Sequence, residues 1–158
     1  MKLRAVALMS AVSIVLFCGC SAKAEPVLPI TSNFTADVQI EYEYVTCSGD
    51  IEFVGTNDFT VNITSPDSLN GLTADYNTGE TNISYKGLNC TGIYDFSAVS
   101  MLENALTEME CYENIEYIDG KFVCDEFALQ TDENGFITFI EFMNIDLKII
   151  LSNHAVIS

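Results

Sequence analysis

A cysteine near the start of the chain stands where a covalent modification is expected. Leu16–Ser21 reads Leu-Phe-Cys-Gly-Cys-Ser, with a small glycine directly before Cys20. Lys2 and Arg4 precede this stretch, and Ala5–Phe17 is apolar apart from two serines. A positive segment, an apolar segment and a small residue at the cleavage position are typical of a signal peptide. We interpret the stretch as a lipobox, in which a peptidase cleaves before Cys20 and a diacylglycerol is attached to its thiol.

The lipobox divides the chain into three expected parts. Residues 1–19 form the lipoprotein signal peptide, residues 20–32 a tether that begins at the lipidated cysteine, and residues 33–158 one β domain. The apolar run of about 13 residues is shorter than the roughly 20 residues of a spanning helix. An ordinary secretory signal cut near Ala22 or Ala24 is the alternative. The prediction is a lipid-anchored protein on the outer face of the cell membrane.

The charge of the chain argues against nucleic acid as a partner. The sequence has 23 acidic and 6 basic residues, a formal net charge of −17. Without Lys2 and Arg4, four basic residues remain against 23 acidic ones, and the formal charge becomes −19. Such a surface is repelled by phosphate backbones and by anionic lipid head groups. The lipid anchor is therefore the predicted contact with the membrane, while a protein partner cannot be named from composition.

The remaining cysteines have two interpretations. Four of them follow Cys20 in the sequence: Cys47, Cys90, Cys111 and Cys124. In an exported protein they can form disulfides, and four cysteines allow three pairings. Free thiols are the alternative in an anaerobic host. Because the chain has one histidine and no Cys-x-x-Cys motif, the sequence predicts no metal site and no cofactor.

The sequence shows no arrangement of catalytic residues. It contains no nucleophile elbow and no glycine-rich phosphate loop, and His154 is expected to be exposed in the tail. Asp132–Glu141 imitates the second half of an EF-hand loop, but Gln130 occupies the position of the first acidic ligand. We interpret this segment as a turn followed by a strand. The chain is therefore predicted not to be an enzyme.

Alternating side chains predict an antiparallel sheet. Phe34–Tyr44 alternates apolar and polar residues, so one face of this strand is expected to be buried. A turn is predicted at Cys47–Asp50, and Phe139 is expected on a buried face. Helical spacing of apolar residues predicts a single helix over Ser97–Met109. Further strands are predicted near Ile51–Phe53, Phe59–Thr64, Leu72–Asn77, Asn82–Leu88, Ile115–Ile118, Lys121–Cys124, Glu126–Gln130, Phe136–Phe142 and Ile145–Leu151.

The order of these elements and several short motifs resemble a known type of protein. Ser65–Leu72 reads Ser-Pro-Asp-Ser-Leu-Asn-Gly-Leu, and Ser84–Leu88 reads Ser-Tyr-Lys-Gly-Leu. After the helix come an Asp119–Gly120 hairpin turn and Thr131–Gly135, which reads Thr-Asp-Glu-Asn-Gly. Over roughly Phe34–Leu151 the chain resembles small lipoproteins of Gram-positive, especially clostridial, bacteria. Their fold is similar to the LolA/LolB lipoprotein-sorting type, which mycobacterial lipoproteins such as LppX and LprG share.

The resemblance implies a fold and a kind of ligand. The implied fold class is α+β, mainly antiparallel β, with a curved sheet (a half-barrel) and one helix packed on the concave face. Proteins of this type are similar to carriers of acyl chains or lipidated partners in an apolar cavity. The sorting proteins have several helices where this sequence predicts one, which implies a smaller cavity or none.

Two hypotheses of function follow. In the first, the domain is a membrane-anchored module that binds a lipid or another hydrophobic ligand. In the second, it is a structural or signalling lipoprotein of the cell surface that acts through a protein partner. A deep apolar pocket under the helix would favour the first, and an exposed strand edge the second. The residues expected to line such a pocket, or else to pack directly on the helix, are Phe34, Tyr42, Phe53, Phe59, Tyr76, Tyr85, Leu102 and Leu106.

Overall fold

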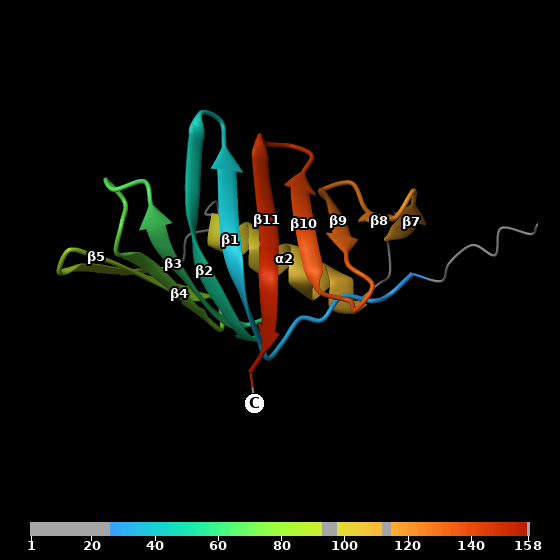
Figure 1. Cartoon of the computed structure of the whole chain (residues 1–158), viewed down its shortest axis with the longest axis horizontal. Coiled ribbons are helices and arrows are strands. Elements are labelled where there is room, and N and C mark those ends of the chain that lie inside the picture. Colours follow the sequence, from blue (N-terminus) through green and yellow to red (C-terminus); the bar gives the residue numbers. More distant parts are fainter. Residues whose placement is uncertain (1–25, 93–97, 112–114, 158) are drawn as a thin grey trace, which may run out of the picture.

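The computed structural model describes residues 26–92, 98–111 and 115–157, and it shows one antiparallel sheet with one helix (Figure 1). In that part of the chain the sheet has eleven strands in the order β6-β5-β4-β3-β2-β1-β11-β10-β9-β8-β7. The sheet is open, because its two edge strands, β6 and β7, are not paired with each other. The helix is α2, Ala98–Cys111. The strands are β1 Phe34–Tyr42, β2 Val45–Gly55, β3 Asp58–Ser65, β4 Leu72–Asn77, β5 Glu80–Tyr85, β6 Leu88–Gly92, β7 Glu116–Ile118, β8 Lys121–Val123, β9 Phe127–Thr131, β10 Ile137–Phe142 and β11 Leu147–Val156.

The first strand confirms the expected alternation and ends earlier than predicted. Phe34, Ala36 and Val38 are buried on one face of β1. The turn that follows lies at Glu43, whose φ of 51° is the left-handed conformation of a tight turn. The turn predicted at Cys47–Asp50 is wrong, because these residues belong to β2 and pair in register with β1. Cross-strand pairing to β1 and β3 outweighs the local turn propensity of this segment.

The last strands confirm the predicted hairpin between β9 and β10, but one side chain is oriented differently from the prediction. Asp132 accepts hydrogen bonds from the backbone N–H groups of Asn134 and Phe136, both at 2.9 Å, and these close the turn between β9 and β10. The prediction that Phe139 is buried is wrong, since it is only partly covered. The register between β9 and β10 shifts between Ile137 and Phe139. An extra residue at such a bulge changes which side chains share a face, so Ile137 and Ile140 are buried together.

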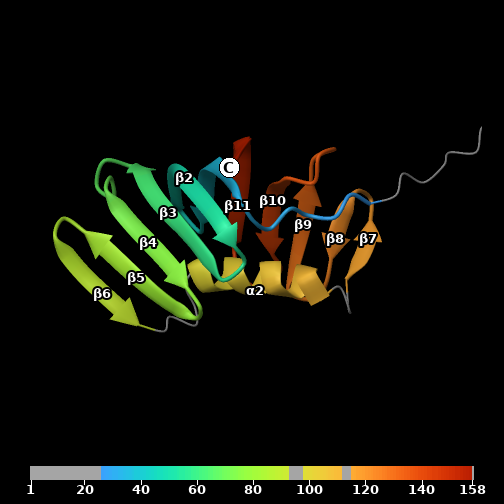
Figure 2. The same cartoon turned by 90° about the horizontal axis from the view of Figure 1, so that it is seen from below.

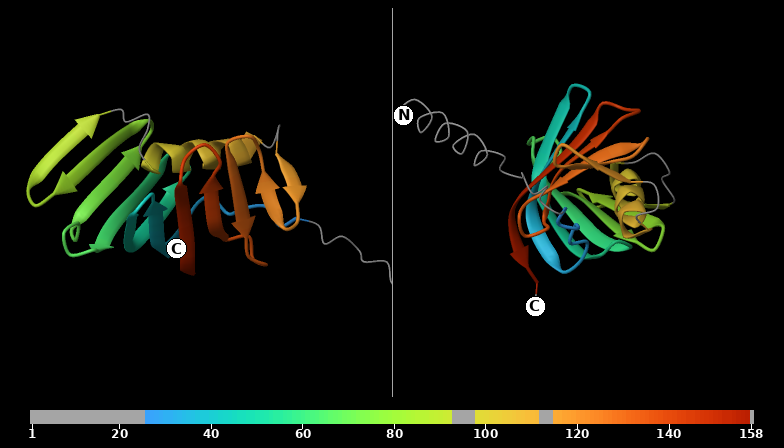
Figure 3. Two further views of the ribbon diagram at one scale, coloured as in Figure 1. Left: turned by 90° about the horizontal axis from the view of Figure 1, so that it is seen from above. Right: turned by 90° about the vertical axis from the view of Figure 1, so that its right-hand side faces the viewer.

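The core lies between α2 and one face of the sheet. Figure 2 shows α2 running across that face, and Figure 3 shows the twist and curl of the strands. The predicted helix over Ser97–Met109 is confirmed for the described residues, which begin at Ala98. Its buried side chains belong to the same hydrophobic cluster as the buried side chains of the strands: Leu102, Ala105, Leu106 and Met109. Within the three described segments, no helix is long and apolar enough to cross a membrane.

Candidate hydrophobic binding site

A row of aromatic rings crosses four neighbouring strands of the buried face. Phe34 of β1 lies 4.7 Å from Phe53 of β2, measured between ring centroids. Phe53 lies 5.3 Å from Phe59 of β3, and Phe59 stacks on Tyr76 of β4 at 5.0 Å. Each of these pairs is directly opposite in the strand register. Antiparallel pairing therefore brings together four of the residues that were expected to line a cavity.

The other four residues that were expected to line a cavity fall into two groups. Leu102 and Leu106 of α2 are 2% and 0% exposed and belong to the same core cluster as the aromatic row. Tyr42 ends β1 with 47% of its surface exposed. Tyr85 of β5 is partly exposed, its hydroxyl donates a hydrogen bond to the Ser68 carbonyl, and Lys86 Nζ lies 4.7 Å from its ring centroid. Tyr42 and Tyr85 thus lie outside the cluster that the other six residues share.

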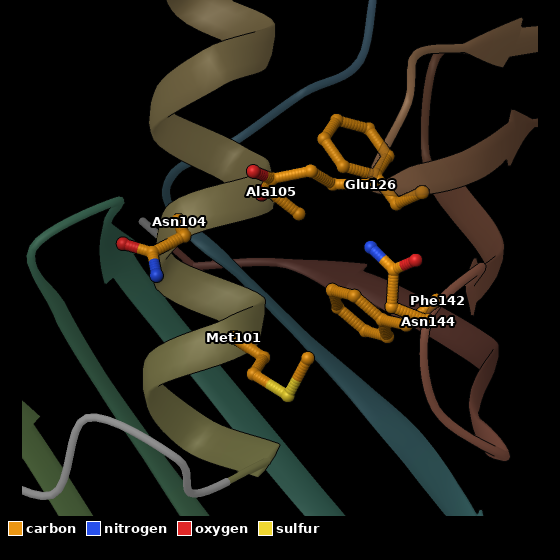
Figure 4. Close-up of a pocket in the computed structure, with 7 residues that line it drawn as sticks. Met101, Asn104, Ala105, Glu126, Phe142 and Asn144 are labelled. Atoms are coloured by element: carbon orange, nitrogen blue, oxygen red, sulfur yellow. The ribbon is translucent and has the colours of Figure 1, made fainter.

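A small pocket opens at the seam between α2 and strands β9 and β10 (Figure 4). Its volume is about 70 Å³, and its lining residues are Met101, Asn104, Ala105, Glu126, Phe127, Phe142 and Asn144. Ala105, Phe127 and Phe142 are also members of the core cluster, and Met101 packs against it. The backbone N–H of Met143 donates to the Glu126 carbonyl at 2.8 Å, which joins the β8–β9 and β10–β11 connections at the pocket. The pocket is therefore an opening from the surface toward the core.

Polar groups at this pocket are acidic or neutral. Figure 4 shows the Glu126 side chain extending toward the helix and the Asn144 amide on the same wall. Glu126 and Asn144 are exposed, as is Asn104 on the helix side. The wall behind them is made by the rings of Phe127 and Phe142, which are 6.5 Å apart. An apolar floor with a few polar groups at its rim is the usual composition of a ligand site.

The other flank of α2 carries a second carboxylate. Glu103 lies close enough to Tyr76 of β4 to act on the phenol electrostatically. Burial raises the pKa of the Tyr76 phenol above its ordinary value of 10.0, and the Glu103 charge raises it further. The two causes act in the same direction, since each disfavours the negatively charged phenolate. Tyr76 is therefore a neutral hydrogen-bonding group within the aromatic row.

A larger hollow lies across strands β1, β2, β3 and β11, and it differs in character. It encloses about 380 Å³, and its walls are mostly polar or small: Asp37, Val38, Gln39, Ser48, Gly49, Thr64, Ile150 and Ser152. The Asp37 carboxylate already accepts a hydrogen bond from Asn153 Nδ2 at 2.6 Å. Because apolar walls are few here, the hollow is a poorer candidate for a hydrophobic ligand than the seam at α2.

The cysteines and the histidine occupy separate places. Cys47 lies in β2, Cys90 in β6 and Cys124 after β8, and no disulfide joins these three to one another. The side chain of Cys111 and all of Cys20 lie outside the described residues, so disulfide formation and lipidation stay predictions.

The expectation that His154 is exposed in a tail is wrong. His154 belongs to β11, its ring stacks on Phe136 at 4.9 Å, and its Nε2 lies 2.8 Å from the Ile137 carbonyl oxygen.

Sequence reasoning misses most of the pocket at the seam. It places Glu126, Phe127 and Phe142 in strands but not in a site, and Asn144 in a connection. The apolar side chains of Phe127 and Phe142 indicate burial, but nothing in the local sequence indicates which strands α2 crosses. The pocket depends on that crossing, which only the three-dimensional arrangement reveals (Figure 2).

Similarity of this chain to known proteins is found among solved structures. No protein-family model matches it, and no curated protein matches it. It is similar to the crystal structure of a LolA superfamily protein from Nitrosomonas europaea, with a TM-score of 0.49 and 10% identity, covering 83% of this chain and 89% of that chain. It is also similar to an uncharacterized conserved protein from Thermus thermophilus, with a TM-score of 0.46 and 9% identity, covering 80% of each chain. Neither likeness says what this chain binds.

Proposed function

We propose that this chain is a membrane-anchored, extracytoplasmic lipoprotein whose domain binds a hydrophobic ligand between α2 and the concave side of its sheet. The observation that carries the proposal is the pocket at the α2 seam, whose inner wall is shared with the hydrophobic core. A ligand that enters there meets Ala105, Phe127 and Phe142, all of which are at most 5% exposed. Burial of each methylene group in such surroundings contributes about 0.8 kcal/mol. The anchor is the lipid on Cys20.

The volume of the pocket determines how binding must occur. At about 70 Å³ it is several times smaller than the roughly 300–1,000 Å³ of typical ligand pockets. It accommodates a short alkyl segment, and a longer chain requires α2 to move away from β9 and β10. Met101 is the partly buried helix residue at this seam. Its unbranched, flexible side chain can rearrange at low cost and widen the opening.

The proposal is tested with an uncharged fluorescent probe. The mature domain, purified without delipidation, is extracted with organic solvent for mass spectrometry, and then titrated with N-phenyl-1-naphthylamine. We expect a co-extracted lipid or a saturable rise in fluorescence. Ala105→Leu fills the pocket and should weaken probe binding at least tenfold. Thr107→Leu places the same side chain on an exposed position of the same helix and should bind as the wild type does.

Two results would remove the basis of the proposal. One is the absence of both an extracted lipid and saturable probe fluorescence. The other is equal probe binding by the wild type and Ala105→Leu, with circular dichroism showing that the variant is folded. The second result would mean that fluorescence reports adsorption to the surface and not occupation of the seam.

A second candidate function rests on the sheet edges. Every residue of β7 and the first four of β6 are exposed, and Leu88 of β6 is 75% exposed. An edge strand of this kind can pair with an extended segment of a partner protein. Leu88→Lys should abolish a partner contact made through β6 while leaving probe binding unchanged. Val54→Lys, at a position that is 51% exposed on an interior strand, is the matched control in a crosslinking experiment on intact cells.

A further inference from the structure

The seam pocket has a polar rim, and the inference drawn from it rests on the proposed function. The rim consists of one carboxylate, that of Glu126, and two amides, those of Asn104 and Asn144. The Glu126 side chain reaches toward α2 from the opposite wall (Figure 4). A ligand whose alkyl end contacts Phe127 and Phe142 therefore places its polar end beside a negative charge.

Positive charges in the described part of the chain are engaged at other places. Lys86 Nζ lies over the Tyr85 ring at 4.7 Å, and Lys121 Nζ lies over the Phe139 ring at 5.3 Å. Lys148 Nζ forms an ion pair with Glu141 Oε1 at 3.5 Å. None of these three lysines lines the pocket. An anionic head group at the rim would thus meet Glu126 without a nearby lysine from these segments to offset the repulsion.

We infer that the pocket selects amphiphiles whose head group is uncharged or cationic and donates hydrogen bonds. An ammonium or hydroxyl group donates to the Glu126 carboxylate and to the Asn144 amide oxygen. An ionised carboxylate or a phosphodiester has no donor to offer Glu126 and is repelled by it. Hydrogen bonds to an ionised acceptor are about twice as strong as neutral ones. Glu126 is therefore the residue that determines head-group specificity.

The test compares three competitors that share one alkyl chain. Dodecylamine, dodecanol and dodecanoic acid displace N-phenyl-1-naphthylamine from the mature domain at pH 7, below their micellar concentrations. We expect the amine to bind at least tenfold more tightly than the acid, with the alcohol between them. Because the whole domain is acidic, the titrations are repeated at about 0.5 M salt, where interactions beyond roughly 4 Å are screened. The preference should persist there if it arises at the rim.

A matched pair of variants separates the rim from the general charge of the domain. Glu126→Gln removes the rim carboxylate and should bring the amine and acid affinities within threefold of each other. Glu133→Gln removes the same charge from the exposed turn at the other end of β9 and should preserve the preference. The inference is overturned if the acid binds wild type as tightly as the amine, or if the two variants behave alike. If none of the three competitors displaces the probe, the inference is overturned, whereas the proposed function is decided separately by saturable probe binding and its loss in Ala105→Leu.

Discussion

Removal of the Leu106 side chain tests whether α2 is held against the sheet. Leu106 is 0% exposed and is one of the largest fully buried side chains. Leu106→Ala removes three carbon groups, worth about 2.4 kcal/mol at roughly 0.8 kcal/mol each. The cavity left behind raises the expected loss of unfolding free energy to about 3–4 kcal/mol. That is a large fraction of the roughly 5–15 kcal/mol that stabilises a typical domain.

The measurement is urea unfolding followed by circular dichroism. The mature domain without its lipid is used, and the midpoint is expected to fall by about 1–2 M for a typical urea dependence. Thr107→Ala, at the exposed neighbouring position, is the control and should change the unfolding free energy by less than about 0.5 kcal/mol. Equal midpoints for the two variants would show that α2 does not contribute to the core, and would remove the structural basis of the seam pocket.

Three further predictions concern the sheet, the pH dependence and the anchor. In Gly49→Ala the added Cβ would lie 1.8 Å from the backbone oxygen of Asn62. Because this overpacking against backbone must separate β2 from β3, the substitution should lower the unfolding free energy by about 3 kcal/mol or more. An unchanged urea midpoint would contradict this prediction. Because Tyr76 has a raised pKa in the folded domain, its stabilising contribution is complete below about pH 10 and is lost as the pH rises through the folded value. Tyr76→Phe should flatten this alkaline loss in unfolding curves from about pH 9 to 12, and an unaltered slope would refute the assignment. Cys20→Ser should move the protein from the membrane fraction to the medium, and retention in the membrane would refute lipidation at this cysteine.

A strand with one solvent-exposed face and one buried face can be predicted from its residues. Phe34, Ala36 and Val38 alternate with polar side chains, and the structure buries them as expected. Strand β6, Leu88–Gly92, is not predicted as a separate strand, because its residues are almost all exposed and show no dry face. Its pairing comes from the backbone of β5. Alternation of apolar and polar residues indicates that one face of a strand is buried. An edge strand without buried side chains therefore shows no such alternation in its sequence.

Sequence patterns also mislead where a β-bulge changes how two strands pair. A strict period of two through β10 would place Phe139 on the same face as the buried Ile137, but the bulge before Phe139 brings Ile140 and Phe142 to the core instead. The aromatic row from Phe34 to Tyr76 can be expected as a set of buried rings, but its order depends on register between strands. The rim residue Glu126 carries no local signal at all, because one exposed carboxylate among 23 acidic residues is distinguished only by the helix that passes in front of it.

The position of the pocket limits how an anchored domain can use it. The backbone N–H of Ile30 donates to the Gly135 carbonyl at 2.7 Å, so the chain from the tether joins the domain at the start of β10. Phe142 and the pocket lie at the other end of β10, about 17 Å along the strand. If Cys20 carries the lipid as we propose, the free tether ends at Val27, whose carbonyl accepts a hydrogen bond from Thr131 Oγ1 at 3.1 Å. The seven residues that follow Cys20, up to Val27, span at most roughly 25 Å. That length exceeds the distance along β10, so the domain can turn its pocket toward the membrane that holds it. Shortening the tether by four residues would leave about 10 Å, less than the distance along β10, and should keep the pocket away from the bilayer. Probe binding in solution should be preserved, while exchange of an amphiphile with the anchoring bilayer should be prevented.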